Sequence, residues 1–416
     1  MRVLHIVFTK NWSWGFSGQV LEENLNYPVD TTISNREIIR DTGYDVILSQ
    51  QITLMRYIME KGKTVCRLGG NYSFENNTKT VFDNELRQVF AVIATNKKLY
   101  NISKRVNPNT FLVPNGLDLT GWNILKEPPD VFTVGFCANI SSQFYRDYKG
   151  YDLVKLVCEK LNTPLKTALY GKGQIPHKQM VSDFYSKISV LLHPTKGEGC
   201  SNTIMEALAC GIPVITTKLA GFHGEMLEDG VNVLFCERTT ESIERCIKRL
   251  KEDRELYEKL KINGRKFAEK YHNIKDVAKA YDTIFNACYQ FNKLKKNKGE
   301  TMRLRYTGSK PQKIVIYGNK QYVFTPECDV DDDDVIKFLL APERKGLFIA
   351  SRTIPTIRVE IPDVFNKILK DEKKATPKEP TQQKKNIFKC PECSFTSTSR
   401  IGVISHQRNK HKRSEK

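Results

Sequence analysis

The first 240 residues alternate between short apolar runs and longer segments. Segments such as 34–41, 52–60 and 151–161 have the length of helices and separate the runs. The apolar runs, each bounded by turn-forming residues, occur at 3–8, 45–48, 64–67, 91–94, 110–113, 132–136, 165–169, 189–192, 214–217 and 233–235. Strands that alternate with helices form parallel sheets covered by helices. The pattern therefore predicts an α/β protein of the doubly wound kind.

Two carboxylates lie eight residues apart in the segment 198–215, which crosses from a predicted loop into a helix. Glu198 precedes the helix start and Glu206 stands about one turn inside it. Ser201, Asn202 and Thr203 are the residues able to cap this helix. The free backbone N–H groups of residues 199–203 would face an anion docked at the helix start. A structural alternative remains, because Thr203 and Glu206 also have the spacing of a capping box.

The longer string around these residues resembles the glutamate-x7-glutamate signature of the GT-B retaining glycosyltransferases of family 4. Residues 188–195 stand where that family has an apolar strand ending in Pro-Ser, and residues 211–225 resemble its Gly-x-Pro-Val strand and Gly-rich turn. Residues 113–118 resemble the turn that ends the family's first Rossmann-like domain. The resemblance implies an acceptor-side lobe at 1–125 and a nucleotide-sugar-binding lobe at 126–292.

The same resemblance implies roles for individual residues. Glu198 would contact the transferred sugar as the catalytic residue, Glu206 would bind the ribose, and Lys149 would hold the diphosphate. Asn139 stands where the family has an arginine, and Arg146 is a candidate substitute. Further expected donor-binding residues are Gly18, from a Gly-rich loop, and Gly199, Cys200, Ser201, Asn202 and Thr203. The family's first-lobe histidine is missing, and His5 is interpreted as a core residue. The implied mechanism is retaining and needs no catalytic metal.

Beyond the second lobe the composition changes. Alternating patterns at 303–365 predict a small β-rich module, to which the sequence assigns no function. Asp329 and Asp331 to Asp334 lie outside both lobes and are interpreted as an acidic turn rather than metal ligands. Residues 366–387 read as a basic linker.

The C-terminal segment 388–413 has the spacing of a Cys2His2 zinc finger. Its four expected ligands to a structural zinc are Cys390, Cys393, His406 and His411. The helix positions that usually meet bases would be Ser399, Gly402 and Ser405, none of which offers a bidentate fork. The residues expected to hold phosphates are Arg400, Arg408, Lys410, Lys412 and Arg413. The finger is thus expected to bind DNA weakly and without sequence preference, and a protein-binding or stabilising role is the alternative.

Charge and composition narrow the class of protein. The formal net charge is +19, and residues 366–416 hold 14 Lys/Arg against 5 Asp/Glu, a local excess of +9. Such an excess suits a polyanion as well as a solvated tail. No apolar run approaches membrane-spanning length, and the 11 scattered cysteines suit a reducing compartment. A cytoplasmic protein without a membrane partner is expected, and its oligomeric state is left open.

The predicted function is sugar transfer from a nucleoside-diphosphate sugar to a hydroxyl, with DNA as partner. By analogy with viral DNA-modifying glycosyltransferases, the acceptor is expected to be a hydroxymethylated pyrimidine in DNA, in the host cytoplasm if the protein is viral. A protein, lipid or polysaccharide acceptor is a second hypothesis. A non-catalytic DNA-binding scaffold with a degenerate transferase fold is a third.

Overall fold

The structure is a computed structural model. It describes residues 1–298 except 8–12, 35, 36, 40, 42, 71–78, 126–128 and 171–174. Further along the chain it describes residues 302–306, 313–317, 320–324, 327–330, 348–350, 356–357, 359–370, 388–389 and 396–397. The chain divides into two compact units, residues 1–369 and 370–416.

The first lobe is built on a parallel sheet in the order β2-β1-β3-β4-β5-β6. Its strands are β1 (Val3–Val7), β2 (Val29–Ile33), β3 (Val46–Ser49), β4 (Thr64–Leu68), β5 (Ala91–Ala94) and β6 (Thr110–Leu112). Its helices are α1 (Ser13–Glu23), η1 (Ile52–Tyr57), η2 (Lys61–Lys63), α3 (Lys79–Gln88) and α4 (Lys97–Lys104). Every residue of β1, β3, β4 and β5 is buried, which explains why these strands read as unbroken apolar runs.

The expectation of a helix at 34–41 is wrong for the described residues of that segment, none of which is helical. Its backbone and side-chain groups bond to the segment around η1 instead. The Ile39 N–H donates to the Tyr57 carbonyl at 3.0 Å, and the Asp41 carboxylate accepts from the N–H groups of Met59 and Glu60, both at 2.8 Å.

The second lobe contains a parallel sheet in the order β11-β10-β9-β7-β8. Its strands are β7 (Val134–Asn139), β8 (Leu165–Tyr170), β9 (Val190–His193), β10 (Val214–Thr216) and β11 (Leu234–Phe235). Its helices are α5 (Gln143–Lys149), α6 (Tyr151–Lys160), η4 (His177–Gln179), α7 (Met180–Asp183), η5 (Tyr185–Lys187), α8 (Asn202–Ala209), α9 (Phe222–Met226), α10 (Thr240–Glu252) and α11 (Arg254–Tyr271). The strand order reverses between β7 and β9, and ligands of open α/β sheets bind at such switch points.

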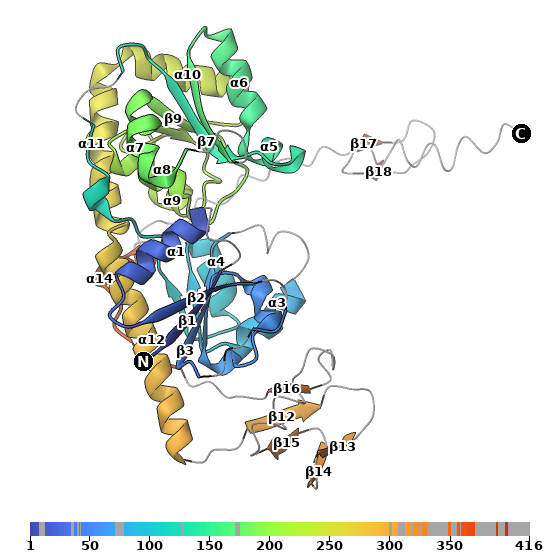
Figure 1. Cartoon of the computed structure of the whole chain (residues 1–416). Coiled ribbons are helices and arrows are strands. Elements are labelled where there is room, and N and C mark those ends of the chain that lie inside the picture. The colour runs from blue at the N-terminus through green and yellow to red at the C-terminus, as the bar shows by residue number, and fades with distance from the viewer. Residues whose placement is uncertain are drawn as a thin grey trace, which may run out of the picture. The chain divides into compact units, whose positions relative to one another are not determined.

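The two lobes are joined by η3 (Leu119–Gly121) and its flanking residues, and by the long helix α12 (Ile274–Lys298). Helix α12 follows the last helix of the second lobe and packs against α1, β3 and η2 of the first lobe (Figure 1). The predicted doubly wound α/β architecture with two Rossmann-like sheets is confirmed.

Past α12 the described strands are β12 (Met302–Tyr306), β13 (Lys313–Tyr317), β14 (Lys320–Phe324), β15 (Glu327–Val330) and β16 (Phe348–Ala350). Strands β15, β12 and β16 form an antiparallel sheet, and β13 pairs with β14. Helix α14 (Asp363–Lys370) begins inside the range assigned to the small module. It buries Phe365 and Ile368 in the hydrophobic core that the lobes share.

In the second unit, β17 (Phe388–Lys389) and β18 (Thr396–Ser397) pair antiparallel. The expected zinc ligands Cys390, Cys393, His406 and His411 lie outside the described residues. So do the expected phosphate contacts Arg400, Arg408, Lys410, Lys412 and Arg413. Of the helices that the structure describes, none combines the length and apolarity needed to cross a bilayer.

Candidate active site at the switch point

Glu198 lies in the loop that follows β9, at the switch point of the second sheet. Its Oε1 atom receives the Lys149 ammonium from the end of α5, and the His193 Nε2 atom lies 2.8 Å from the same oxygen. His193 is the last residue of β9 and is buried, while the Glu198 side chain is 15% exposed. Two elements on either side of the strand reversal thus meet at one carboxylate oxygen.

The surroundings keep Glu198 ionised. Burial alone would raise the pKa of this carboxyl, but the Lys149 charge and the His193 hydrogen bond outweigh burial and lower it to about 2. Burial lowers the pKa of His193, which favours the neutral ring. A neutral His193 that donates from Nε2 fits the observed contact with Glu198. The site therefore holds a fixed anion and a cation side by side.

Glu206 lies inside α8 and is the acceptor of a second polar cluster. The Tyr185 hydroxyl donates to Oε2 at 2.8 Å, and His177 Nε2 lies 3.1 Å from Oε1. The ring of Trp122 packs against both, with centroids 5.4 Å from His177 and 5.7 Å from Tyr185. The N-cap of α8 is Ser201, which accepts from the Ile204 N–H, so Glu206 does not close the capping box that the spacing allowed.

The protonation of this cluster follows from its burial and its hydrogen bonds. Burial would lower the pKa of His177, but the hydrogen bond and the charge of Glu206 raise it overall. Burial, followed by the Glu206 charge, raises the pKa of Tyr185 well above its usual value. The Glu206 carboxylate thus accepts from the Tyr185 hydroxyl and faces the His177 ring.

Backbone of the two lobes meets around the Glu198 loop. A Cβ on Gly199 would lie 2.0 Å from the Gly69 carbonyl oxygen of the first lobe. A Cβ on Gly221, whose φ is +59°, would lie 2.2 Å from the Glu198 carbonyl oxygen. The Asn96 side chain donates to the Gly199 carbonyl at 3.0 Å. Glycine at 199 and 221 is therefore required by close packing, and Gly199 sits at a lobe contact.

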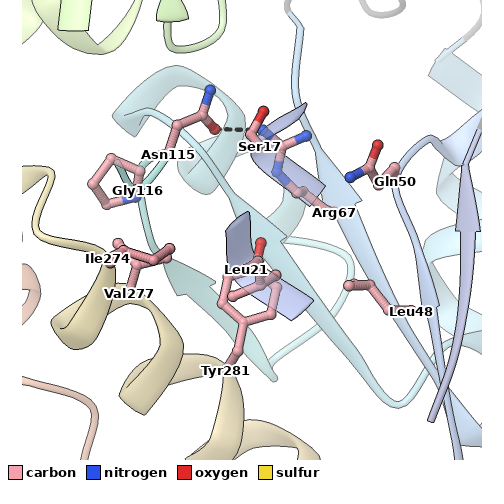
Figure 2. A pocket seen from close by; sticks show the side chains of 11 residues that line it. Ser17, Leu21, Leu48, Gln50, Arg67, Asn115, Gly116, Ile274, Val277 and Tyr281 are labelled. Carbon is pink, nitrogen blue, oxygen red and sulfur yellow. Dashed lines mark hydrogen bonds between the residues drawn. The ribbon is translucent and has the colours of Figure 1, made fainter. Parts of the chain in front are cut away.

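A buried polar network ties the start of α8 to the first lobe. The Asn115 amide donates to the Cys200 carbonyl at 2.9 Å and to Asn202 Oδ1 at 2.6 Å, and Asn115 Oδ1 accepts from Arg67. The Asn202 amide donates to Ser17 Oγ at 3.0 Å. Arg67, Asn115 and Ser17 line a small pocket, with their side chains turned toward it in Figure 2. Asn202, expected to bind the donor, thus serves as a link between lobes in this arrangement.

The remaining predicted residues lie in different settings. Gly18 belongs to helix α1 rather than to a Gly-rich loop, and a Cβ there would lie 2.6 Å from Gln50 Nε2. Asn139 ends β7, and its side chain accepts from the Ser141 N–H at 2.8 Å. Arg146 donates to both Asp152 oxygens, at 2.9 and 3.0 Å, so its charge is balanced there rather than at Glu198. The Thr203 carbonyl accepts from Tyr185 at 3.3 Å. His5 is buried in β1, as expected of a core residue.

Sequence reasoning named Lys149 as a donor-site residue but missed the other partners of the two glutamates. His193 ended a predicted strand and offered a signal, because a polar residue at the carboxyl end of a parallel strand faces the ligand edge. His177 and Tyr185 lie in the connection between β8 and β9 and carry no motif. Glu225 was also missed. It accepts from the N–H groups of Lys97 at 2.8 Å and Lys98 at 3.2 Å, at the start of α4 in the other lobe.

Comparison with known proteins finds a family model that matches part of the second lobe. Residues 139–267 match the model of glycosyl transferases group 1. An uncharacterized glycosyltransferase of Methanocaldococcus jannaschii is 32% identical over 108 residues, which cover 25% of this chain and 30% of that protein. The capsular polysaccharide biosynthesis glycosyltransferase CapM of Staphylococcus aureus is 27% identical over 147 residues, covering 33% of this chain and 39% of CapM. The chain thus spans about a third of the length of these relatives.

Solved structures share the fold. HepE of Anabaena, in complex with UDP and glucose, superposes with a TM-score of 0.54 at 16% identity, covering 67% of this chain and 97% of HepE. Sucrose-phosphate synthase of Thermosynechococcus elongatus gives 0.51 at 14% identity, covering 72% and 99%. The family match and this fold support the prediction of a nucleotide-sugar-dependent glycosyltransferase with a GT-B architecture. They do not bear on the predicted zinc finger, DNA acceptor or viral origin.

Proposed function

We propose that the chain transfers a sugar, with retention of configuration, from a nucleoside-diphosphate sugar to a hydroxyl acceptor. The observation that carries this proposal is the cluster of Lys149, His193 and Glu198 at the switch point, inside the segment that matches the glycosyl transferases group 1. Glu198 contacts the transferred sugar, and Lys149 turns from Glu198 to the diphosphate when the donor binds. Glu206 receives the ribose hydroxyls in place of one of its present donors.

The reaction balances without a further reactant. The bond between the anomeric carbon and the diphosphate oxygen breaks, and a bond from that carbon to the acceptor oxygen forms on the same face. The acceptor proton passes to the leaving diphosphate. Lys149 stabilises the negative charge that grows on the diphosphate. Electrostatic stabilisation of this kind is usually the largest single contribution to catalysis.

The donor part is tested with a panel of sugar nucleotides, measuring donor binding by calorimetry and donor hydrolysis by release of the nucleoside diphosphate. Wild type is expected to bind and slowly hydrolyse one class of donor, and Glu198→Gln to bind it without hydrolysis. Glu159→Gln, whose side chain is 62% exposed on α6, is the matched control and should behave as wild type. Absence of both binding and hydrolysis across the panel would favour the non-catalytic scaffold.

For the acceptor we propose a hydroxymethylated pyrimidine in DNA, with the reaction in the cytoplasm of a host cell. The proposal is supported by the charge excess of residues 366–416 and by the Cys-x2-Cys-x12-His-x4-His spacing within them. A flipped-out base would enter between the lobes to reach the donor. Incubation with hydroxymethylated and plain duplexes, followed by mass spectrometry of the nucleosides, tests it. Sugar found only on protein, lipid or polysaccharide acceptors would rule DNA out while leaving the transferase intact.

A further inference from the structure

Three side chains able to bind a metal meet in the interior of the first unit, and none of them belongs to the predicted finger. Cys200 lies two residues after Glu198, His223 lies in α9, and His272 lies between α11 and α12. One potential ligand atom of each lies within 4.8 Å of those of the other two, and all three residues are buried. Within the described part of the chain, no other group of this kind occurs.

The hydrogen bonds around His272 orient its ring toward the other two residues. Its Nδ1 atom lies 2.8 Å from the Asn115 carbonyl, which can only accept, so Nδ1 carries the proton. Nε2 then presents a lone pair, and it lies 3.1 Å from Nε2 of His223. Histidines that bind metals usually donate their other ring N–H to a carbonyl or carboxylate in this way. Zinc–nitrogen bonds of about 2.0–2.1 Å in a tetrahedral site separate two nitrogens by roughly 3.3 Å. The imidazole pair is therefore spaced almost as two ligands of one ion would be.

The protonation states of the two histidines and the charges near Cys200 bear on whether the site can hold a metal cation. Burial lowers the pKa of His272 to about 4 and that of His223 well below its usual value, so both rings are neutral ligands. Burial raises the pKa of the Cys200 thiol to about 12, and the charges that act on this thiol include the Arg67 cation and two carboxylates. The two carboxylates are those of Glu198 and Glu225, and their attraction for a cation held at the thiol opposes the repulsion from Arg67. A thiolate and imidazoles are the ligand types that zinc prefers.

We propose that one zinc ion binds to Cys200, His223 and His272. The ion would hold the loop that carries Glu198 to the segment between α11 and α12, where the chain passes from the second lobe to the first. On binding, the Cys200 thiol proton leaves to solvent. The proton that His223 would otherwise share through Nε2 moves to its Nδ1 atom, which has no hydrogen-bond partner among the described residues. Because the site is closed, the ion enters as the chain folds, and its binding free energy adds to stability. The ion fixes Cys200 and thereby the loop that carries Glu198.

The test uses the full chain, produced in zinc-supplemented medium, with Cys390→Ser and Cys393→Ser present throughout to remove the predicted finger. We expect one equivalent of zinc per chain by elemental mass spectrometry. His272→Asn should lose it, because asparagine keeps a donor for the Asn115 carbonyl but lacks the Nε2 ligand. Cys158→Ser, which alters a buried cysteine outside the cluster, should retain it. Zinc content at background level in the parent, or unchanged in His272→Asn, would overturn the proposal and leave a hydrogen-bonded histidine pair.

A second measurement on the parent chain keeps the proposal testable if a variant does not fold. The parent chain is unfolded, stripped with a chelator and refolded with Co²⁺, whose bond to a thiolate gives an intense near-ultraviolet absorption. This band is expected in the parent and absent in Cys200→Ser, while a folded parent without the band contradicts the site. Removing zinc should also lower the melting temperature of the parent. None of these readouts depends on sugar transfer, so their outcome is separate from that of the proposed function.

Discussion

At the scale of single residues, Glu198 shows how a buried charge is made tolerable. A carboxylate removed from water costs free energy unless a cation or donors face it. Lys149, from helix α5, and His193, from strand β9, both contact the Oε1 atom of Glu198. The charge that the proposed chemistry needs is thus held ready by side chains that are far apart in the sequence.

Replacing Lys149 by methionine is expected to destabilise the fold and abolish most activity. It leaves Glu198 buried without its cation, which typically costs about 3–5 kcal/mol. Loss of the positive charge at the diphosphate should lower kcat by about 10²- to 10³-fold. Urea unfolding and donor turnover measure the two effects. The double variant K149M/E198Q should regain much of the stability but none of the activity, and equal instability of the single and double variants would contradict the pairing.

The stability contributed by the His177–Glu206 contact is expected to depend on pH. The pKa of His177 is raised in the folded state, so the contribution is fully present below its unfolded value of about 6.5 and is lost as pH rises through the folded value. Wild type should therefore lose stability relative to His177→Gln over the pH range that begins near 6.5 and extends upward. Urea midpoints across this range check the difference. A difference in stability that stays constant with pH would show that His177 is not charged in the folded protein. The control is Tyr185→Phe, which removes the other donor to Glu206 and should keep the pH dependence.

At the scale of elements, the loop after β9 and the turn after β10 are shaped by glycines that allow backbone to approach backbone. Gly199 touches the Gly69 carbonyl of the other lobe, whereas a Cβ on Gly70 would meet no atom of the described residues within 4 Å. These two positions offer a matched pair.

Gly199→Ala is expected to push the lobes apart or displace the Glu198 loop. Overpacking of this kind costs about 1–3 kcal/mol, and the displaced Glu198 should lower turnover by about tenfold or more. Gly70→Ala should match wild type in both melting temperature and turnover. If Gly199→Ala also matched wild type, the contact between Gly199 and Gly69 would not exist in solution.

The strands were largely predictable because parallel strands buried on both faces are continuous apolar runs. Strand β2 was missed since it is an edge strand with polar, half-exposed residues, as in Val29–Ile33. The position of Glu198 before α8 was also predictable from cap and turn residues. Its contacts were not, because Lys149 and Glu198 are 49 positions apart in the sequence and carry no local signal of their contact. Arg146, the expected substitute cation, pairs instead with Asp152, which is only six positions away and lies in the first turn of α6.

At the scale of the whole molecule, the chain returns to the core that the two lobes share after the strands β12 to β16. The Ile357 N–H donates to Asn109 Oδ1 at 2.9 Å, next to β6, and Ile361, Phe365 and Ile368 are buried in the shared core. Because α12 and α14 both pack into this shared core, the strands between them form an insertion whose two ends are anchored.

Phe365→Ala is expected to destabilise the first unit by about 3–5 kcal/mol, because the ring is fully buried. Phe144→Ala is the matched control, since that ring is 47% exposed and its removal should change stability by no more than about 0.5 kcal/mol. Denaturant unfolding followed by tryptophan fluorescence measures both. A mild effect of Phe365→Ala would mean that α14 is dispensable for the core.

The two connections between the lobes run side by side. The Leu117 N–H donates to the His272 carbonyl at 2.8 Å, and the Ile274 N–H returns a bond to the Leu117 carbonyl at 3.1 Å. A single strand of chain would let one lobe swivel about it in any direction. Two connecting segments that are hydrogen-bonded to each other act as a two-segment hinge, which permits rotation about one axis and resists twisting. Opening to admit a donor and closing over it should therefore follow the same arc, returning Gly199 to Gly69 with each turnover.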